Sequence, residues 1–403
     1  MSAALPLKQG SSSFLPYGRQ TIEEDDIAAV CQALRGDFLT TGPLVGRFEE
    51  ALAKTVAAGH AVVCSSGTAA LYMAARALKL STGSKVVVPS ITFLATASAP
   101  HLAGAEIVFA DVDPESGLMR AGDLEDALAR TGRAHAVFNV HLNGQCGEVE
   151  EIAQVARRHG LAILDDACHA LGTTKRDAKV GGNAFSDMTV FSFHPVKTVT
   201  MGEGGAVTTN SAELAEALRR ERNHGMTRHA NEFESGDGFD QDGRANPWYY
   251  ELIEPGFNWR ATDIHCALGL SQLAKLARFS ARRRALAAAY DTLLAPYAPM
   301  IRPVTRQAGC SPTLHLYAVL IDFPACGISR ATVMERLARE GIGTQVHYYP
   351  VHRQRYYAAR YGRLDLPGAD RYYARVLSLP FFASMAISDA GRVVDGLART
   401  LGL

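Results

Sequence analysis

Short apolar runs alternate with helix-length amphipathic stretches through the first half of this chain. The apolar runs predict strands at residues 61–64, 85–89, 106–111, 134–140, 161–164 and 188–193. Helical spacing lies between several of them, as at residues 68–78 and 149–159, and two further helices are expected at 23–34 and 45–56. Because strand–helix–strand repeats form parallel sheets covered by helices, the sequence predicts an α/β fold with a mostly parallel sheet.

The pattern changes after about residue 258. A long helical region at 262–294 is followed by strand candidates at 314–321 and 343–347 and by a closing helix from residue 388. The sequence therefore predicts a flexible N-terminal arm (1–15), a large α/β domain (16–260) and a smaller C-terminal α+β domain (261–403). The polar, glycine-rich stretch 224–246 is expected to be a long functional or disordered loop.

Charge and cysteine content exclude several classes of protein. The 41 Lys and Arg residues balance the 41 Asp and Glu residues, so no nucleic-acid partner is expected. The seven cysteines are dispersed, which favours reduced thiols in a cytoplasmic protein and gives no reason to expect a metal. No signal-like or membrane-length apolar run is present, so we expect no membrane association.

A small-residue turn follows the first predicted strand. In VVCSSGTAAL, the residues Ser66, Gly67 and Thr68 come directly after the strand and open a helix. A helix N-terminus with free N–H groups and hydroxyl donors can bind a phosphate. Ordinary helix capping by Ser and Thr explains the same residues.

An acidic pair ends the strand of AILDDACHALG. Ligands of open α/β sheets gather at the carboxyl ends of strands, where Asp166 is expected, with His169 one helical turn later. A carboxylate at this place can pair with the nitrogen of a pyridine cofactor. The alternatives are a helix-capping acid and a histidine packed in the core.

A lysine and an aromatic residue complete the pattern. Lys197 follows the strand of TVFSFHPVKTVTMGEGG, which also carries Ser192, and a neutral lysine amine can condense with an aldehyde. Phe93, in PSITFLATASAP, follows another strand and could stack on a ring. An exposed lysine and a core phenylalanine are the alternative interpretations.

These motifs occur in the order phosphate turn, aromatic residue, acid and lysine. Together with GFNWRATDIHCALG, they make nearly the whole chain resemble the DegT/StrS family of aminotransferases, which act on nucleotide-linked sugars with pyridoxal 5′-phosphate (PLP) and have fold type I. The resemblance implies that Lys197 binds PLP, that Asp166 pairs with the pyridine nitrogen, and that His169 contacts the ring oxygen or orients Asp166. Phosphate contacts are implied for Ser66, Gly67, Thr68 and Ser192.

The resemblance also implies a homodimer, because Asn258 in these proteins reaches the cofactor phosphate of the neighbouring subunit. FSFHPVK, NPWYYELIEPGFNWR and GIGTQVHYYP are similar to family members of pseudaminic acid biosynthesis. Those enzymes aminate C4 of a UDP-linked 4-keto-6-deoxy-N-acetylhexosamine with glutamate as donor. Arg260, His347 and Tyr348 are candidates for binding the nucleotide sugar, with core or surface packing as the alternative.

Two other interpretations remain open at the level of sequence. The chain could be a PLP enzyme of the same fold that acts on another nucleotide ketosugar or as a lyase. It could also be a regulatory or binding protein that kept the fold without the chemistry. The presence of Asp166, His169 and Lys197 together favours an enzyme, since a non-catalytic relative is expected to have lost at least one of them.

Overall fold

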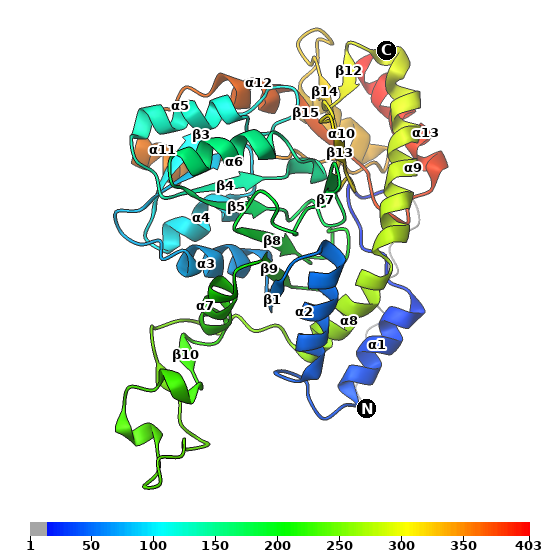
Figure 1. Cartoon of the computed structure of the whole chain (residues 1–403). Helices are drawn as coiled ribbons and strands as arrows, with labels where there is room; N and C mark the ends of the chain where they lie inside the picture. The colour runs from blue at the N-terminus through cyan, green and yellow to red at the C-terminus, as the bar shows by residue number, and fades with distance from the viewer. Residues whose placement is uncertain (1–13) are drawn as a thin grey trace.

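The computed structural model describes residues 14–403 (Figure 1). The predicted arm of residues 1–15 therefore lies almost wholly outside the described residues. Leu15 is buried, and its N–H donates to the Gly341 carbonyl oxygen at 2.8 Å. This bond joins the start of the described chain to its C-terminal part.

A seven-stranded sheet forms the centre of the molecule, in the order β1-β9-β8-β5-β4-β2-β3. Its strands are β1 (His60–Cys64), β2 (Lys85–Pro89), β3 (Glu106–Ala110), β4 (Ala136–Val140), β5 (Ala162–Asp166), β8 (Met188–Ser192) and β9 (Gly205–Thr209). Every neighbouring pair is parallel except those of β9, which runs antiparallel to both β1 and β8. The predicted α/β architecture with a mostly parallel sheet is confirmed, and the six strands expected in it all form. The sequence pattern missed β9.

Helices cover both faces of this sheet (Figure 1). One face packs against α3 (Gly67–Ala77) and α4 (Leu94–Leu102), and the other against α2 (Pro43–Val56), α5 (Ala121–Thr131) and α6 (Val149–Arg158). Successive residues of a strand point to opposite faces. Val86 and Val88 accordingly pack with the first set of helices, and Val87 packs with the second.

The C-terminal part contains a second, antiparallel sheet. Its order is β12 (Ile301–Pro303), β14 (Tyr317–Ile321) and β15 (Val376–Leu379). This sheet packs with α9 (Leu276–Leu294), α10 (Arg330–Arg339) and α13 (Ile387–Leu401) around its own apolar core. The predicted domain boundary at residues 260/261 stays a prediction. The remaining helices are α1 (Glu24–Leu34), α7 (Ala212–Arg222), α8 (Asp263–Ala274), α11 (Arg355–Tyr361) and α12 (Pro367–Arg375).

The helical region expected at 262–294 is confirmed, whereas the strand expected at 343–347 is wrong. The helical region expected at 262–294 is two helices, α8 and α9, which meet at Lys275. The strand expected at 343–347 does not form. Only Gln345 pairs, through a single bridge to Ser378, and the chain then turns away. That turn takes His347 and Tyr348 to the edge of the large sheet, so the segment positions side chains instead of extending a sheet.

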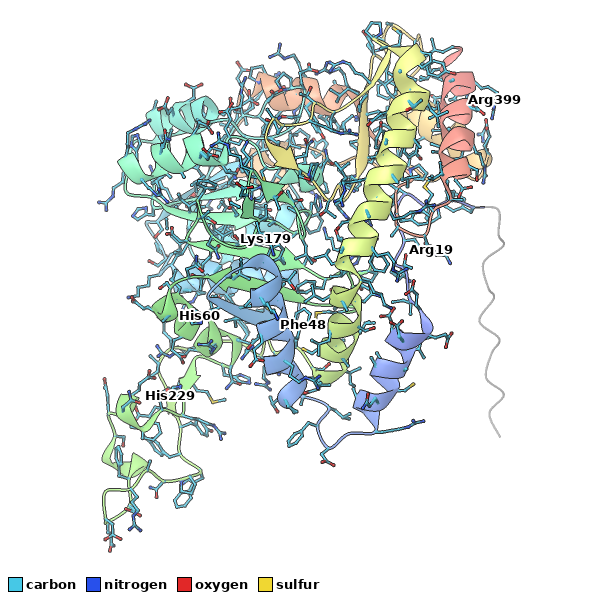
Figure 2. The ribbon with its side chains drawn as sticks, turned by 45° about the vertical axis from the view of Figure 1, so that its right-hand side comes forward. Arg19, Phe48, His60, Lys179, His229 and Arg399 are labelled. Atoms are coloured by element: carbon cyan, nitrogen blue, oxygen red, sulfur yellow. The ribbon has the colours of Figure 1, made fainter. Side chains whose placement is uncertain are left out.

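Residues 226–256, here called the projecting segment, stand away from the body of the molecule (Figures 1 and 2; His229 is labelled). The segment overlaps the loop expected at 224–246 and has structure of its own. Its ends pair as β10 (Met226–Thr227) and β11 (Glu251–Leu252). Inside it, the Phe233 ring packs on Tyr249 at 4.8 Å between centroids.

None of the helices in residues 14–403 combines the length and the apolar character that crossing a bilayer requires.

Candidate active site

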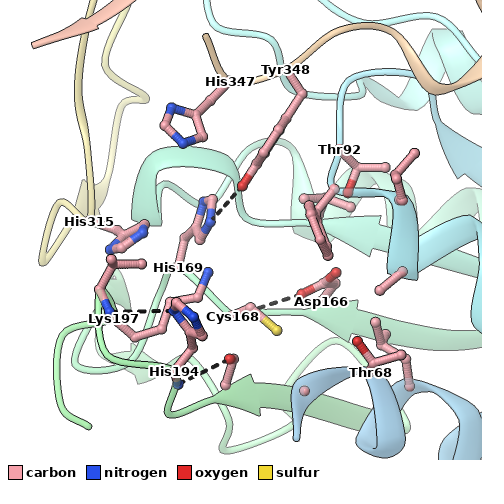
Figure 3. Close-up of a pocket in the computed structure, with 18 of the residues that line it drawn as sticks. Thr68, Thr92, Asp166, Cys168, His169, His194, Lys197, His315, His347 and Tyr348 are labelled. Atoms are coloured by element: carbon pink, nitrogen blue, oxygen red, sulfur yellow. Dashed lines mark hydrogen bonds between the residues drawn. The ribbon is translucent and has the colours of Figure 1, made fainter. Parts of the chain in front are cut away.

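A cavity of about 790 Å³ opens at the sheet edge where β1, β5 and β8 have their carboxyl ends (Figure 3). These ends share one edge because β9 is antiparallel to both β1 and β8, which leaves β1 and β8 pointing the same way. Ten of the twelve residues predicted for the site line the cavity. They are Ser66, Gly67, Thr68, Phe93, Asp166, His169, Ser192, Lys197, His347 and Tyr348.

The predicted phosphate turn is the N-terminus of α3. Ser66 is the N-cap, and its Oγ accepts the Ala69 N–H at 3.1 Å. Because the first N–H groups of a helix have no intrahelical partner, those of Gly67 and Thr68 remain available to a ligand. The positive end of the α3 dipole lies at the same point. The turn can therefore bind a phosphate through backbone groups without a lysine or arginine.

Two glycines allow this turn to pack tightly against the sheet. Gly205 of β9 lies between Cys64 of β1 and Ser192 of β8. A Cβ atom on Gly205 would lie 2.2 Å from the Ser66 carbonyl oxygen, which is too close for any side chain. A Cβ atom on Gly67 would lie 2.9 Å from the Ser192 Cβ. The absence of both side chains thus brings the Ser192 hydroxyl next to the N-terminus of α3.

Asp166 is the last residue of β5 and is 7% exposed. Its Oδ2 accepts the Thr96 hydroxyl at 2.6 Å, and its Oδ1 accepts the Cys168 N–H at 3.2 Å. Thr96 in turn contacts the Thr92 hydroxyl at 2.8 Å. These bonds fix the direction of the carboxylate at the cavity floor, where it can accept a hydrogen bond from a ring N–H.

Lys197 lies in the turn after β8, where its backbone N–H donates to the His194 carbonyl oxygen at 2.9 Å. Burial lowers the pKa of its amine below the ordinary 10.5, although the nearby Cys168 and Asp166 side chains oppose the shift. No residue in the range 14–403 forms a hydrogen bond or ion pair with Lys197 Nζ. A buried amine with no fixed partner and a lowered pKa is suited to attack a carbonyl carbon.

His169 forms the centre of an aromatic wall opposite Asp166. Its Nε2 lies 3.2 Å from the Tyr348 hydroxyl, and its ring packs on His315 at 4.4 Å between centroids. Burial, followed by the charge of Lys197, holds the pKa of His169 well below its ordinary value. The imidazole is therefore neutral near pH 7 and presents a flat, uncharged face to the cavity.

Phe93 and Tyr348 lie on the open side of the cavity. Phe93 is the residue before α4, is 55% exposed, and has its ring 6.1 Å from that of Tyr348. An exposed ring at a cavity mouth can pack on a flat ligand. His347 is buried beside it, and its Nδ1 contacts the Ser378 hydroxyl at 2.8 Å.

Two predicted residues do not reach this cavity. Asn258 is exposed, and its Oδ1 accepts the backbone N–H of Arg260 at 3.1 Å. The guanidinium of Arg260 donates to Asn223 Oδ1 at 2.5 Å. Both residues follow the projecting segment and do not line the cavity, although the carbonyl oxygen of Trp259 between them accepts the N–H of Ser65, which does line it, at 2.8 Å.

Sequence reasoning missed three contributors, Thr96, His315 and Tyr17. Thr96 lies inside a helix, His315 comes from the C-terminal part, and Tyr17 comes from the N-terminal stretch, with its ring 5.6 Å from His347. His315 and Tyr17 belong to none of the motifs quoted above, and Thr96 lies in PSITFLATASAP, where only Phe93 was singled out. The pattern of small residues in LATASA, which allows close helix packing, is the nearest signal for Thr96.

The model of the DegT/DnrJ/EryC1/StrS aminotransferase family matches residues 20–398. The chain belongs to this family. Its fold matches PseC of Helicobacter pylori, an aminotransferase involved in the biosynthesis of pseudoaminic acid, with a TM-score of 0.87 and 29% identity over 96% of this chain and 99% of that one. DesI, solved in the presence of its TDP-sugar product, is 32% identical with a TM-score of 0.84, over 97% of this chain and 94% of that chain. Spr1654 of Streptococcus pneumoniae in its PLP form is 25% identical with a TM-score of 0.85, over 96% and 99%.

As a member of this family, the chain is a PLP-dependent sugar aminotransferase of fold type I. The cavity fits the cofactor on its own geometry. It offers a phosphate turn at α3, a buried carboxylate on the floor, and a lysine amine with a lowered pKa. The close packing that Gly67 and Gly205 allow places the Ser192 hydroxyl beside the N-terminus of α3, so both can donate to one phosphate.

Proposed function

We propose that this enzyme transfers an amino group from glutamate to C4 of a UDP-linked 4-keto-6-deoxy-N-acetylhexosamine, as in pseudaminic acid biosynthesis. The observation that carries the proposal is the convergence of Lys197, Asp166 and His169 on one cavity beside the N-terminus of α3. The likeness to PseC, across nearly the full length of both chains, supports the choice of sugar.

Each side chain has a defined role in this proposal. Lys197 would hold the cofactor, and Asp166 would accept the hydrogen bond of its ring N–H. Phe93 would stack on the ring, and His169 would contact the ring oxygen or orient Asp166. The phosphate would bind to Ser66, Gly67, Thr68 and Ser192. Bound PLP supplies an electron sink for the negative charge that forms when a carbon acid loses its proton.

Lys197 Nζ would also move the proton in both half-reactions. Once the amino donor has taken its place on the cofactor, the released amine is free inside a buried cavity. Its lowered pKa increases the share of neutral amine relative to an ordinary lysine, and the neutral amine is the form that acts as a general base. It would take the proton from the donor's α-carbon and later deliver one to C4 of the sugar.

The proposal includes a homodimer with shared active sites. Asn258 is exposed and lies outside the cavity of its own chain, as expected for a residue that binds the phosphate in the partner's site. Arg260 lies beside it and would face the nucleotide sugar there, whereas His347 and Tyr348 would contact the sugar from within the same chain.

A second candidate is an aminotransferase for a TDP-linked ketosugar. It is favoured by the likeness to DesI, which is more similar in sequence to this chain than PseC is. The two candidates share all the cofactor contacts and differ only in the sugar and base that the open side of the cavity accepts.

The proposal can be tested by absorbance spectroscopy of the purified protein with PLP. The wild type is expected to show the band of lysine-bound cofactor and to lose it when glutamate is added. A UDP-linked 4-keto-6-deoxy-N-acetylhexosamine should then restore the band. Lys197→Ala should lack the band, whereas Lys54→Ala, which changes an exposed lysine on α2, should behave like the wild type.

The outcomes separate the candidates. Restoration of the band by dTDP-4-keto-6-deoxyglucose, but not by the UDP sugar, would replace the proposed substrate with the second candidate. Loss of the band with another amino acid, but not with glutamate, would identify that amino acid as the donor. An unchanged band in Lys197→Ala would remove Lys197 from its role.

A further inference from the structure

Two cysteines meet outside the active site, where residues 141–146 pack against residues 305–315. We call this contact the seam. The side chain of Gln145 bonds to the Thr305 carbonyl oxygen at 3.4 Å and accepts the Gln307 N–H at 3.1 Å. At the centre of the seam, the backbone N–H of Cys146 donates to the Cys310 Sγ at 3.3 Å.

We propose that Cys146 and Cys310 form a redox modification site, a thiol pair that a hydroperoxide oxidises to a disulfide within the chain. The sulfur of Cys310 is already in contact with the residue whose sulfur it would join. The seam holds the two backbones together from both sides of this contact, so the disulfide requires no large backbone movement.

Cys310 is the more reactive of the two cysteines, because it is more exposed and its thiol has the lower pKa. It lies in a short edge strand next to the exposed residues Gly309 and Ser311, whereas Cys146 is 1% exposed. The Cys146 thiol and N–H both point at its sulfur, and these hydrogen bonds lower the pKa of Cys310 in spite of burial. Reactive cysteines are found in partly exposed sites of this kind.

Lys175 adds positive charge at the same place. It lies opposite Cys310 in the register of β13 (Cys310–Ser311) and β6 (Thr174–Lys175). Its Nζ donates to the carbonyl oxygens of Gly147 and Ala308, each at 3.1 Å, so the ammonium group is held between the two cysteine-bearing segments. By contrast, burial raises the pKa of Cys64 and of Cys266 to about 12, so those thiols are unreactive.

The reaction balances with hydrogen peroxide as the oxidant. The Cys310 thiolate attacks one peroxide oxygen, the O–O bond breaks, and the hydroxide that leaves takes up a proton to become water. The Cys146 thiol then loses its proton and attacks the Cys310 sulfur of the sulfenic acid. The S–S bond forms, the S–O bond breaks, and a second water leaves. Two thiols are oxidised and one peroxide is reduced.

The position of the disulfide gives it a structural consequence. Residues 310–315 run from the pair to His315, whose ring packs on His169 in the active site. The backbone N–H of His315 donates to the Asn143 carbonyl oxygen at 3.1 Å, which is part of the same seam. Oxidation would therefore tie this wall of the cavity covalently to the segment that follows β4.

The experiment treats the full-length, PLP-loaded enzyme with hydrogen peroxide and maps its peptides under non-reducing conditions. Peptides that contain Cys146 and Cys310 should appear cross-linked, two of the seven thiols should be lost from titration, and dithiothreitol should restore both. Cys146→Ser and Cys310→Ser should form no such cross-link. Cys326→Ser, which changes a partly exposed cysteine outside the seam, should cross-link like the wild type.

A second measurement uses only the wild type and so does not depend on the folding of a variant. At pH 7, iodoacetamide should label Cys310 at least about tenfold faster than Cys326, since burial and Asp322 raise the pKa of Cys326. Persistence of all seven thiols in peroxide, or a disulfide between other cysteines, would overturn the proposal. Equal labelling of Cys310 and Cys326 would also contradict it.

Discussion

The cavity and the projecting segment differ in which side chains they bury and which they expose. At the cavity, Asp166, His169 and Thr96 are buried; the Thr96 hydroxyl donates to Asp166, and the Tyr348 hydroxyl contacts His169 Nε2. The projecting segment has its own small core around Phe233, yet exposes Trp248 by 71% and Leu252 by 61%. Exposed apolar side chains grouped on one surface are typical of an interface. One chain thus holds most of the predicted cofactor contacts together with an exposed apolar surface.

The two regions differ in which predicted cofactor contacts they hold. Every predicted cofactor contact except Asn258 lies in one cavity, and Asn258 comes two residues after the projecting segment. If the two regions meet, they meet between subunits.

Replacement of Lys197 by Ala should have the largest effect. It removes both the covalent attachment and the base, so we expect the glutamate half-reaction to slow by about 10⁴-fold. Single-turnover absorbance kinetics measure this rate. Lys197→Arg should not recover it, because a guanidinium stays protonated and cannot act as the base. Recovery by Arg would mean that charge alone is what the position supplies.

Asp166→Asn should slow the same half-reaction by about a hundredfold, since it replaces a charged hydrogen bond to the cofactor ring by a neutral one. The band of lysine-bound cofactor should persist, shifted in wavelength, because Lys197 is intact. Thr96→Val removes the hydroxyl that orients Asp166 at 2.6 Å and should cause a smaller loss. Equal losses in the two variants would contradict the assignment of Asp166 as the direct contact.

Asn258→Ala should weaken PLP binding by about tenfold, which is the value of one phosphate hydrogen bond. Mixing this variant with Lys197→Ala sharpens the comparison between the two regions. If Asn258 acts in the partner's site, each mixed dimer contains one site with both residues intact, and tight PLP binding with normal turnover should return in that site.

The control for this mixture is the double variant that carries both changes in one chain. If Asn258 acts in the partner's site, a mixed dimer of this double variant with wild type has one defect in each site, so neither of its sites is intact. The opposite result is that the activity of the mixture of Lys197→Ala and Asn258→Ala equals the sum of the activities that the two variants have separately. That result would show that Asn258 acts within its own chain.

The histidines of the cavity should make the cofactor-free protein sensitive to mild acid. Burial lowers the pKa of His347 to about 3 in the folded chain from an ordinary value of 6.5. The unfolded chain therefore binds the proton first, and stability falls as the pH drops from 6.5 toward 3. His347 should account for about 1 kcal/mol of the free energy of unfolding lost between pH 7.5 and 5.5.

Urea unfolding at the two pH values measures this loss. His347→Asn should reduce the difference, whereas His159→Gln, which changes an exposed histidine after α6, should leave it unchanged. A pH dependence that is the same in His347→Asn and wild type would exclude this histidine as a source of the acid sensitivity.

The smallest effect is expected in the projecting segment. Phe233→Ala removes the ring that packs on Tyr249 and Phe239, so the segment should open locally while the free energy of global unfolding changes by less than about 1 kcal/mol. Limited proteolysis should then cut faster within residues 226–256. A large fall in global stability would show that the segment is part of the main core.

The sequence by itself determined the elements whose signals are local. Short apolar runs fixed six strands of the large sheet to within a few residues, because buried parallel strands need continuous apolar side chains. The motifs around Ser66, Asp166 and Lys197 predicted three parts of the cavity, because each lies at or shortly after the end of a strand, and these ends share one edge of the sheet. A turn at a strand end is set by a few neighbouring residues.

Only the tertiary structure decided which distant residues join them. β9 escaped the sequence pattern, yet its antiparallel placement with Gly205 is what brings the α3 turn close to Ser192. His315 and Tyr348 enter the site because the C-terminal part packs over the sheet edge, and the same packing brings Cys310 to Cys146. Contacts between residues far apart in the chain depend on the packing of whole elements, which no local pattern of residues encodes.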